Sequence, residues 1–341
     1  MSLQTPLKSY GTVCCFGELL LRMSPVLHQQ WIATQQMPVF IGGAELNVAT
    51  ALAQWNVPVK YCTALPDHYL AKEIVADITS KNINTNDIHF SGSRIGTYYL
   101  PQGADLKNAG VIYDRAYSSF WELQPGDINW DKVFQNVSWF HFSAISPALN
   151  EVVAKVCKQA LEEAKSRAIT VSVDLNYRAK LWQYGIAPST IMQTLLPYCD
   201  VIMGNLWAVE SLAGLVSPIK DSKGVSNERL KEAAIESMLM LQQQYPNATS
   251  LAYTFRLDDV YWTILKQAHG YYFSKEYSMR TVTDKVGSGD CFMGGIIYGL
   301  YHQHPAQQVI DFATAAAYGK MHETGDATRQ TIAQVNQRLL Q

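Results

Sequence analysis

The sequence has few charged residues and no marked excess of either sign. Charged side chains make up 16% of its 341 residues, and 27 basic against 29 acidic residues give a formal net charge of -2. Proteins that bind nucleic acids or anionic membranes usually carry a basic excess, so we expect neither partner. The sequence also lacks any uninterrupted apolar run of about 18 residues, which argues against a membrane-spanning helix.

Several common chemical signatures are absent as well. The six cysteines form no C-x-x-C pair, and runs such as TVCCFG and PYCDVIMG predict buried, reduced thiols. There is no G-x-x-x-x-G-K-[ST] phosphate loop, no H-E-x-x-H and no G-x-S-x-G. The first residues, MSLQTPLKSYG, lack the apolar core of a signal peptide, so a cytoplasmic location is expected.

What is present is an alternation of strand-like and helix-like segments. The predicted strands are TVCCFGEL, VKYCTAL, SWFHFSAI, ITVSVDLN, CDVIMGN and SLAYTF, followed by a β-hairpin over 259–274. The predicted helices cover about 43–56, 69–80, 149–166, 188–197, 226–244, 288–303, 305–323 and 329–340. This order predicts an α/β fold with a mainly parallel sheet covered on both faces.

Two segments interrupt the alternation. Residues 20–40 and 93–122 contain short β-prone runs with no predicted helix between them, and we expect added antiparallel strands there. Such strands can form a small β-sheet lid over the mouth of the main sheet. No long linker divides the chain, so residues 1–341 are expected to form a single domain that carries this lid.

The most informative motif is DKVGSGDCFMGGIIYGL, which starts at Asp284. A turn made of Gly287, Ser288 and Gly289 opens a predicted helix, and free N–H groups at such a point favour an anion. Asp290 lies in the first turn of this helix, where the dipole should keep its carboxylate ionised and able to accept a proton. An ionised carboxylate beside an oxyanion site suits phosphoryl transfer. The residues alone equally allow a helix N-cap beside a flexible turn.

A second motif, GGAELNVA, lies about 240 residues earlier in the chain. Its glycines, Gly42 and Gly43, allow close approach of a polyol to the backbone, and Asn47 can hydrogen-bond to hydroxyls. The alternative is an ordinary strand-to-helix turn with a surface asparagine.

Together the two motifs resemble the paired signatures of the ribokinase-like (PfkB-type) carbohydrate kinases, over nearly the whole chain. The resemblance implies a three-layer α/β/α sandwich with a β lid, and Mg-ATP as phosphoryl donor. It makes Asp290 the catalytic base and assigns the anion hole to the turn that precedes it. The DLNYRAKLW segment brings Asn176 to the nucleotide in this interpretation, and Asn205 of GNLWAVE keeps a phosphate or metal-water role.

Segments in the middle of the chain resemble those of 2-keto-3-deoxygluconate kinases. They are RIGTYYL, VIYDRAYSSF and DLNYRAKLW. By this resemblance Arg115 and Arg178 bind the carboxylate of an acid sugar, while Tyr98 and Tyr113 line the sugar site. Arg178 can instead contact the ATP phosphates. Asp326 of MHETGDATR is a substrate-contacting acid by resemblance, or else a loop aspartate.

The sequence departs from the family pattern at the nucleotide site. Ala208 stands where many relatives have a metal-organising glutamate, with Glu210 two places later, and no metal ligand is assigned. Arg256 replaces the first glycine of the nucleotide turn and can reach a phosphate or remain an exposed loop residue. Lys285 and Ser288 also replace the commonest residues of the anion-hole motif.

Three functions remain open from the sequence. The leading one is ATP-dependent phosphorylation of 2-keto-3-deoxygluconate at its primary hydroxyl. The second is a fructokinase or another neutral-sugar kinase of the same family. The third is a sugar or nucleotide sensor without catalysis. The family also suggests a homodimer that forms through the lid.

Overall fold

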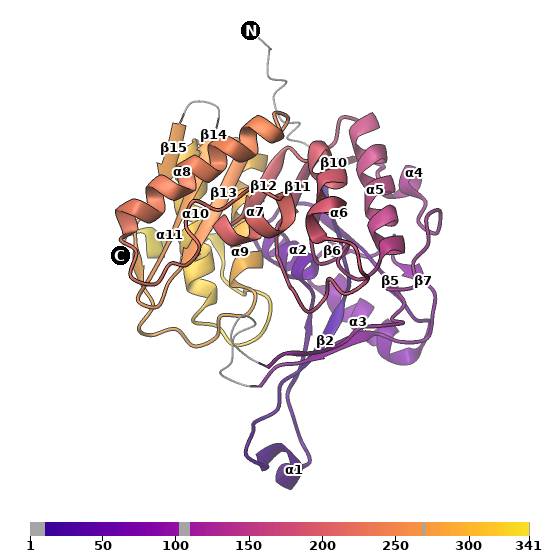
Figure 1. Cartoon of the computed structure of the whole chain (residues 1–341). Helices are drawn as coiled ribbons and strands as arrows, with labels where there is room; N and C mark the ends of the chain where they lie inside the picture. Colours follow the sequence, from indigo (N-terminus) through magenta and orange to yellow (C-terminus); the bar gives the residue numbers. More distant parts are fainter. Residues whose placement is uncertain (1–10, 102–109, 268–269, 341) are drawn as a thin grey trace.

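The computed structural model describes residues 11–101, 110–267 and 270–340 and has a large sheet at its centre (Figure 1). In spatial order its strands are β15 (Gly270–Phe273), β14 (Val260–Gln267), β13 (Ser250–Arg256), β12 (Val201–Gly204), β11 (Thr170–Asp174), β10 (Val137–Ser143), β1 (Thr12–Phe16), β4 (Val59–Cys62) and β6 (Ile83–Asn84), and β16 (Tyr277–Ser278) pairs with β14. Strands from β13 to β6 run parallel, whereas β14 pairs antiparallel with β13, β15 and β16. The mainly parallel sheet predicted from the sequence is confirmed.

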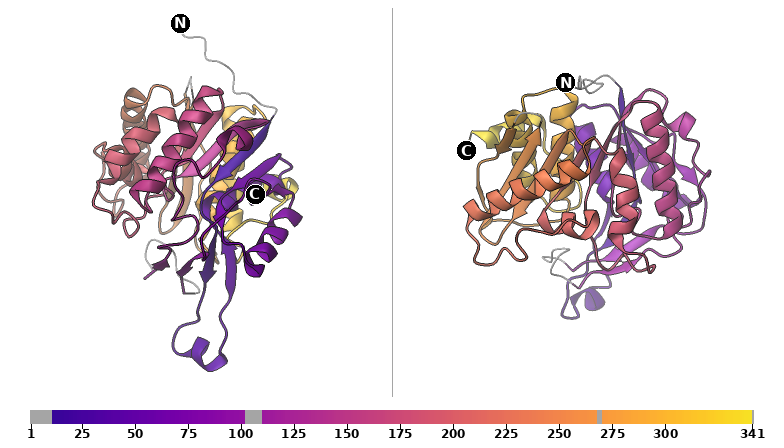
Figure 2. Two further views of the ribbon diagram at one scale, coloured as in Figure 1. Left: turned by 90° about the vertical axis from the view of Figure 1, so that its right-hand side faces the viewer. Right: turned by 45° about the horizontal axis from the view of Figure 1, so that its top comes forward.

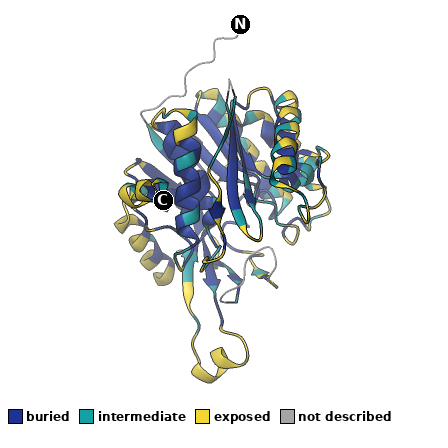
Figure 3. Cartoon of the chain, turned by 90° about the vertical axis from the view of Figure 1, so that its left-hand side faces the viewer, coloured by how far each residue is buried: buried dark blue, intermediate teal, exposed yellow. Residues whose placement is uncertain are grey.

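Helices cover both faces of this sheet, because successive residues of a strand point to opposite sides. In β1, Cys14 and Phe16 join one hydrophobic core while Val13 and Cys15 join the other. The first core is completed by α4 (Trp130–Val133), α5 (Glu151–Ser166), α6 (Pro188–Leu195), α7 (Leu206–Ala213) and α8 (Asn227–Gln244). The second is completed by α2 (Ala44–Gln54), α3 (Tyr69–Ser80), α9 (Ser288–Tyr301), α10 (Ala306–Lys320) and α11 (Ile332–Leu339). The fold is therefore a three-layer α/β/α sandwich, and Figure 3 shows its buried centre.

The lid is a second, four-stranded sheet at one end of the sandwich. Its order is β3 (Val39–Gly42), β2 (Leu20–Met23), β8 (Gly96–Tyr99) and β9 (Ile112–Asp114). The hairpin of β2 and β3 projects away from the body and carries the short helix α1 (Gln30–Thr34) near its tip (Figure 2). Two further strands, β5 (Ala64–Leu65) and β7 (His89–Phe90), form a small separate pair.

Several details differ from the sequence-based expectation. Helix α1 interrupts a segment that was expected to contain only strands, and β2 pairs with β8 in parallel because the chain returns through the body between them. Helix α7 was not predicted, although Asn205 caps its first turn and Gly214 ends it in the left-handed conformation. The 310 helix η1 (Leu196–Tyr198) ends the predicted helix over 188–197. Parts of the predicted lid (102–109) and of the hairpin (268–269), with the N-terminal ten residues, lie outside the described residues.

The sequence also predicted buried, reduced cysteines and argued against a membrane-spanning helix. All six cysteines are buried and free. Within the described ranges, no helix has the length and apolar character needed to cross a membrane.

Candidate active site

A cavity of about 410 Å³ opens at the carboxyl ends of the parallel strands, beneath the lid. Ligands of open α/β sheets bind at this edge, where loops that follow neighbouring strands converge. The cavity brings together almost all of the residues that the sequence indicated: Gly43, Asn47, Tyr98, Tyr113, Arg115, Asn176, Arg178, Asn205, Arg256, Gly287, Ser288, Gly289, Asp290 and Asp326. Gly42 is not among the lining residues. A side chain at Gly42 would overlap the Asp326 carboxylate, so this glycine makes room for that acid.

The turn before α9 is shaped so that a ligand can approach its backbone. Gly287 caps the helix with a positive φ of 75°, and a Cβ there would overlap the carbonyl oxygen of Asp326. Gly289 is different, because a Cβ at this position would meet only Met203, at 3.9 Å. Protein packing therefore does not require a glycine at 289. The open space lies on the cavity side of a helix N-terminus, as an oxyanion site needs.

Asp290 lies in the first turn of α9 and is buried at the cavity. The side-chain amide of Asn47 donates a hydrogen bond to its Oδ2 at 2.7 Å, across 243 residues of sequence. Burial raises the pKa of Asp290 to about 7, and this effect outweighs the hydrogen bond from Asn47. The expectation that the helix dipole keeps this carboxylate ionised takes no account of burial, which leaves it only partly ionised near neutral pH. A pKa near the working pH is the value that suits a general base.

Asn47 does more than was expected of a sugar-binding residue. Its amide nitrogen orients Asp290, while its Oδ1 is buried and has no hydrogen-bond partner among the described residues. A buried acceptor without a partner is costly, and here it belongs to a residue that lines the cavity. A substrate hydroxyl would satisfy it.

Asp174 is a site residue that the sequence analysis missed. It ends β11, is buried and lines the cavity. Burial, with a smaller contribution from the neighbouring Asp290 carboxylate, raises the pKa of Asp174 to about 8. Its place at the carboxyl end of a predicted parallel strand, directly before Asn176, was the signal that could have found it.

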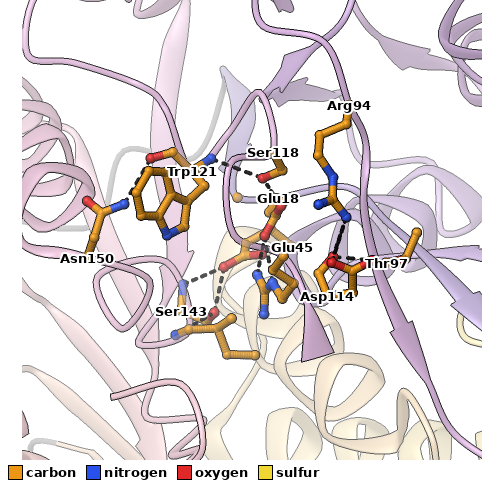
Figure 4. Close-up of polar contacts among 12 residues, drawn as sticks. Glu18, Glu45, Arg94, Thr97, Asp114, Ser118, Trp121, Ser143 and Asn150 are labelled. Carbon is orange, nitrogen blue, oxygen red and sulfur yellow. Dashed lines mark hydrogen bonds and ion pairs between the residues drawn. The ribbon is translucent and has the colours of Figure 1, made fainter. Parts of the chain in front are cut away.

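Arg115 is less available than the sequence suggested. Its Nε donates to the Glu18 carboxylate at 2.6 Å. Ser118 donates to the same carboxylate at 2.5 Å, and Figure 4 shows these two residues side by side. The Arg115 and Glu18 side chains are almost completely buried, so the charge of Arg115 is balanced inside the protein. A second buried acid, Glu45, accepts hydrogen bonds from the backbone and hydroxyl of Ser143 in the same view.

Asp326 is held by two residues of the lid. Arg22 Nε donates to its Oδ1 at 2.7 Å, and the Tyr98 hydroxyl donates to its Oδ2 at 3.0 Å. The guanidinium of Arg22 also lies 3.6 Å from the Asp284 carboxylate and stacks on the ring of Phe40. Asp326 is thus a buried, oriented acid at the cavity wall and not an exposed loop aspartate.

Arg178 contrasts with Arg115. It is half-buried, lines the cavity, and donates to the carbonyl oxygen of Tyr177 at 3.1 Å. Across the part of the chain that the structure describes, no carboxylate lies within ion-pair distance of its guanidinium. Its positive charge acts to lower the pKa of Asp174 and of Asp290, and its place in the cavity lining makes it available to an anion that enters.

The nucleotide-side residues of the sequence analysis contact the anion-hole turn. Arg256, the last residue of β13, donates to the carbonyl oxygen of Lys285 at 3.4 Å and to the Ser288 hydroxyl at 3.2 Å. Asn205 uses its side-chain oxygen to cap α7 through the backbone of Ala208, at 2.9 Å. Arg256 and Asn205 both line the cavity, so they remain candidates for phosphate contacts.

Glu210 does not take the place of the metal-organising glutamate that many relatives have at the position of Ala208. Its carboxylate pairs with Lys220, and Glu210 is not among the residues that line the cavity. No cluster of three potential metal ligands occurs among the described histidine, cysteine and acidic side chains. Magnesium in phosphoryl-transfer sites needs only one or two carboxylates besides phosphates. Asp174 fits that requirement, because it is a buried carboxyl group at the cavity.

Comparison with known proteins agrees with this geometry. The chain matches the family described as pfkB family carbohydrate kinase over residues 11–331. It is 25% identical to 2-dehydro-3-deoxygalactonokinase of Haloferax volcanii over 317 residues, which cover 91% of each protein. The structure resembles that of 2-dehydro-3-deoxygluconokinase of Thermotoga maritima, with 30% identity, a TM-score of 0.85, and 97% of this chain and 100% of that chain covered.

A second solved structure extends the agreement. A PfkB family carbohydrate kinase of Listeria grayi is 27% identical with a TM-score of 0.84, and the match covers 97% of this chain and 100% of that one. The family match itself includes both sequence motifs and every strand of the main sheet. The chain belongs to the PfkB family of carbohydrate kinases.

Proposed function

We propose that this kinase transfers the γ-phosphoryl group of ATP to the primary hydroxyl of 2-keto-3-deoxygluconate and forms the 6-phosphate. The observation that carries the proposal is the combination, in one cavity, of the buried base Asp290 and the guanidinium of Arg178, which has no ion pair with a carboxylate of the described residues. The carboxylate of an acid sugar matches the planar fork of that guanidinium, whereas a neutral sugar offers it no anionic group.

In the proposed reaction the sugar hydroxyl lies between Asp290 and the turn of residues 287–289. Its oxygen attacks the γ-phosphorus while Asp290 takes the hydroxyl proton, and the bond from the γ-phosphorus to the bridging oxygen of ADP breaks. Asn47 orients Asp290 for this step through its 2.7 Å hydrogen bond. The backbone N–H groups of the turn stabilise negative charge on the phosphoryl group.

ATP and Mg²⁺ are the expected partners of this chemistry. The family uses ATP, and we expect Arg256, Asn205 and Asn176 to contact its phosphates from the ends of the strands. Asp174 would share in holding Mg²⁺, which neutralises charge on the phosphates when it is bound. Such an enzyme would work in the cytoplasm, where ATP is available.

The C4 epimer, 2-keto-3-deoxygalactonate, is a second candidate substrate. The similarity to the Haloferax volcanii enzyme, whose name specifies the galacto compound, favours it. Both epimers carry the carboxylate that Arg178 would bind, so the cavity chemistry alone accepts either. Asp326, held rigidly by Arg22 and Tyr98, is the group that we expect to select between hydroxyl configurations.

A coupled assay of ADP release tests the proposal. The wild type is given 2-keto-3-deoxygluconate, its C4 epimer, fructose and a nucleoside in parallel, and we expect turnover of the acid sugars. A clear preference for fructose or a nucleoside would overturn the acid-sugar assignment. The absence of turnover with every sugar, combined with intact ligand binding in Asp290→Asn, would favour a sensor.

We also propose that the enzyme forms a homodimer through its lid. The hairpin that carries α1 projects from the body (Figure 2), and several of its large apolar side chains are exposed. They are Val26, Leu27, Trp31, Ile32 and Val39. Such a patch on a projecting hairpin is suited to pairing with the same patch of a second copy.

A further inference from the structure

Lys320 is a buried ionisable residue that the reaction described above does not use. It is the last residue of α10, and none of its surface is exposed. Lysine is rarely buried completely, because removing an ammonium group from water costs free energy. A fully buried lysine close to an active site therefore indicates a specific role.

The Lys320 side chain lies behind the anion-hole turn. A Cβ placed on Gly287 would be 3.5 Å from Lys320 Cε, which is ordinary van der Waals contact. Lys320 Nζ donates to the carbonyl oxygen of Glu323 at 3.2 Å. Lys320 is fully buried and is not among the cavity-lining residues, so its side chain packs behind the turn from within the protein.

The backbone next to Lys320 is tied to the segment that leads into the turn. The carbonyl oxygen of Met321 accepts hydrogen bonds from the N–H groups of Thr283 and Asp284, at 2.8 and 3.0 Å. The Asp284 carboxylate then accepts the N–H of Val286 at 2.9 Å. The end of α10 and the start of the turn thus form one connected unit.

Acidic groups around Lys320 favour its charged form. Burial lowers its pKa, while Asp284, Glu323 and Asp326 act in the opposite direction. When it is protonated, the Lys320 side chain adds to the partial positive charge at the N-terminus of α9. In a site that excludes water, a positive charge behind the turn acts on a phosphoryl group more strongly than it would in water.

We propose that Lys320 is a positioning residue for phosphoryl transfer, whose ammonium holds the turn of residues 287–289 and supplies fixed positive charge behind it. This inference rests on the proposed role of that turn as an anion hole. It assigns part of the rate to a side chain that touches neither sugar nor nucleotide.

The test compares Lys320→Met with Lys60→Met. Lys60 is a matched control, because it is also buried and its Nζ contacts Asp87 and the Val133 carbonyl oxygen, away from the cavity-lining residues. We expect Lys320→Met to lower kcat about 10- to 100-fold with little change in the KM of the sugar. Added ammonium or potassium, at a constant ionic strength of about 0.1 M maintained with tetramethylammonium, should restore part of that kcat. Lys60→Met should keep its kcat and gain nothing from either ion.

The wild type supplies a measurement that does not depend on the folding of any variant. In the wild type the Lys320 ammonium already occupies the position behind the turn. Its turnover should therefore be the same in potassium and in tetramethylammonium. Several-fold activation of the wild type by potassium would overturn the proposal. A folded Lys320→Met enzyme with unchanged kcat, or one with a loss that neither ion reduces, would overturn it as well.

Failure of the underlying proposals appears in separate experiments. If 2-keto-3-deoxygluconate is not the substrate, the wild type will not phosphorylate it. The kinetic comparison is then made with whichever sugar the wild type accepts. The variant Gly289→Ala tests the anion-hole role. Packing tolerates the added methyl group, but it fills the space that the phosphoryl group would occupy. If that variant keeps full activity, the turn does not bind the phosphoryl group.

Discussion

The cavity wall on the lid side and the cavity floor differ in how their charged side chains are paired. On the lid side, Arg22 pairs with Asp326 and Arg115 pairs with Glu18, so the charges are balanced within the protein. On the floor, Arg178 has no carboxylate at ion-pair distance among the described residues, and burial raises the pKa of Asp174 and Asp290. The wall is thus assembled before any ligand arrives, whereas the floor retains groups that only a ligand can satisfy. The difference indicates that the wall gives shape and the floor carries the chemistry.

The largest expected effect comes from the floor. Asp290→Asn should lower kcat by about 10³- to 10⁴-fold, because the hydroxyl loses its proton acceptor. The same variant should be at least as stable as the wild type at pH 8. The folded-state pKa of Asp290 is raised to about 7, so above that pH the buried charge destabilises the fold, and asparagine removes it. Steady-state kinetics and thermal unfolding check the two outcomes, and an active Asp290→Asn enzyme would end the assignment of the base.

The pH dependence of kcat/KM should report the same group. Only the ionised carboxylate accepts a proton, so kcat/KM should fall about tenfold per pH unit below about 7, the value to which burial raises the pKa of Asp290. The amide of Asn47 stabilises the carboxylate, so Asn47→Ala should move the midpoint to higher pH. A midpoint that stays in place in this variant would show that another group controls the profile.

A substitution in the wall should lower the stability of the fold more than it lowers catalysis. Arg115→Ala leaves Glu18 buried without its cation, and we expect the free energy of unfolding to fall by about 3 to 5 kcal/mol. The double variant Arg115→Met with Glu18→Gln removes both charges and should recover much of that loss. Denaturant unfolding measures both. Equal losses in the single and double variants would mean that the pair does not act as a unit.

The smallest expected effect on catalysis lies at the tip of the lid. Ile32 is 58% exposed, and Ile32→Asp should convert the proposed dimer to a monomer while kcat stays within about twofold. Light scattering and steady-state kinetics on the same samples check this. A wild type that is monomeric at micromolar concentration would remove the proposal of a lid-mediated dimer.

The sequence predicted the parts of the site that are encoded locally. The glycine turn, Asp290 at a helix start and Asn47 one turn into α2 were readable because each depends on neighbours in the chain. The contacts between them were not. Asn47 reaches Asp290 across 243 residues, and Arg115 reaches Glu18 across 97, so no local pattern indicated either pair. The raised pKa of Asp290 depends on burial by distant elements, which explains why the helix dipole alone did not indicate it.

The most direct test of the division between wall and floor compares two arginines on two sugars. We measure kcat/KM for 2-keto-3-deoxygluconate and for fructose in the wild type, Arg178→Ala and Arg115→Ala. Arg178→Ala should lower the ratio of acid to neutral sugar by about 100-fold, the value of a lost charged contact, whereas Arg115→Ala should change it by less than about fivefold. A ratio that collapses in Arg115→Ala and survives in Arg178→Ala would contradict the account.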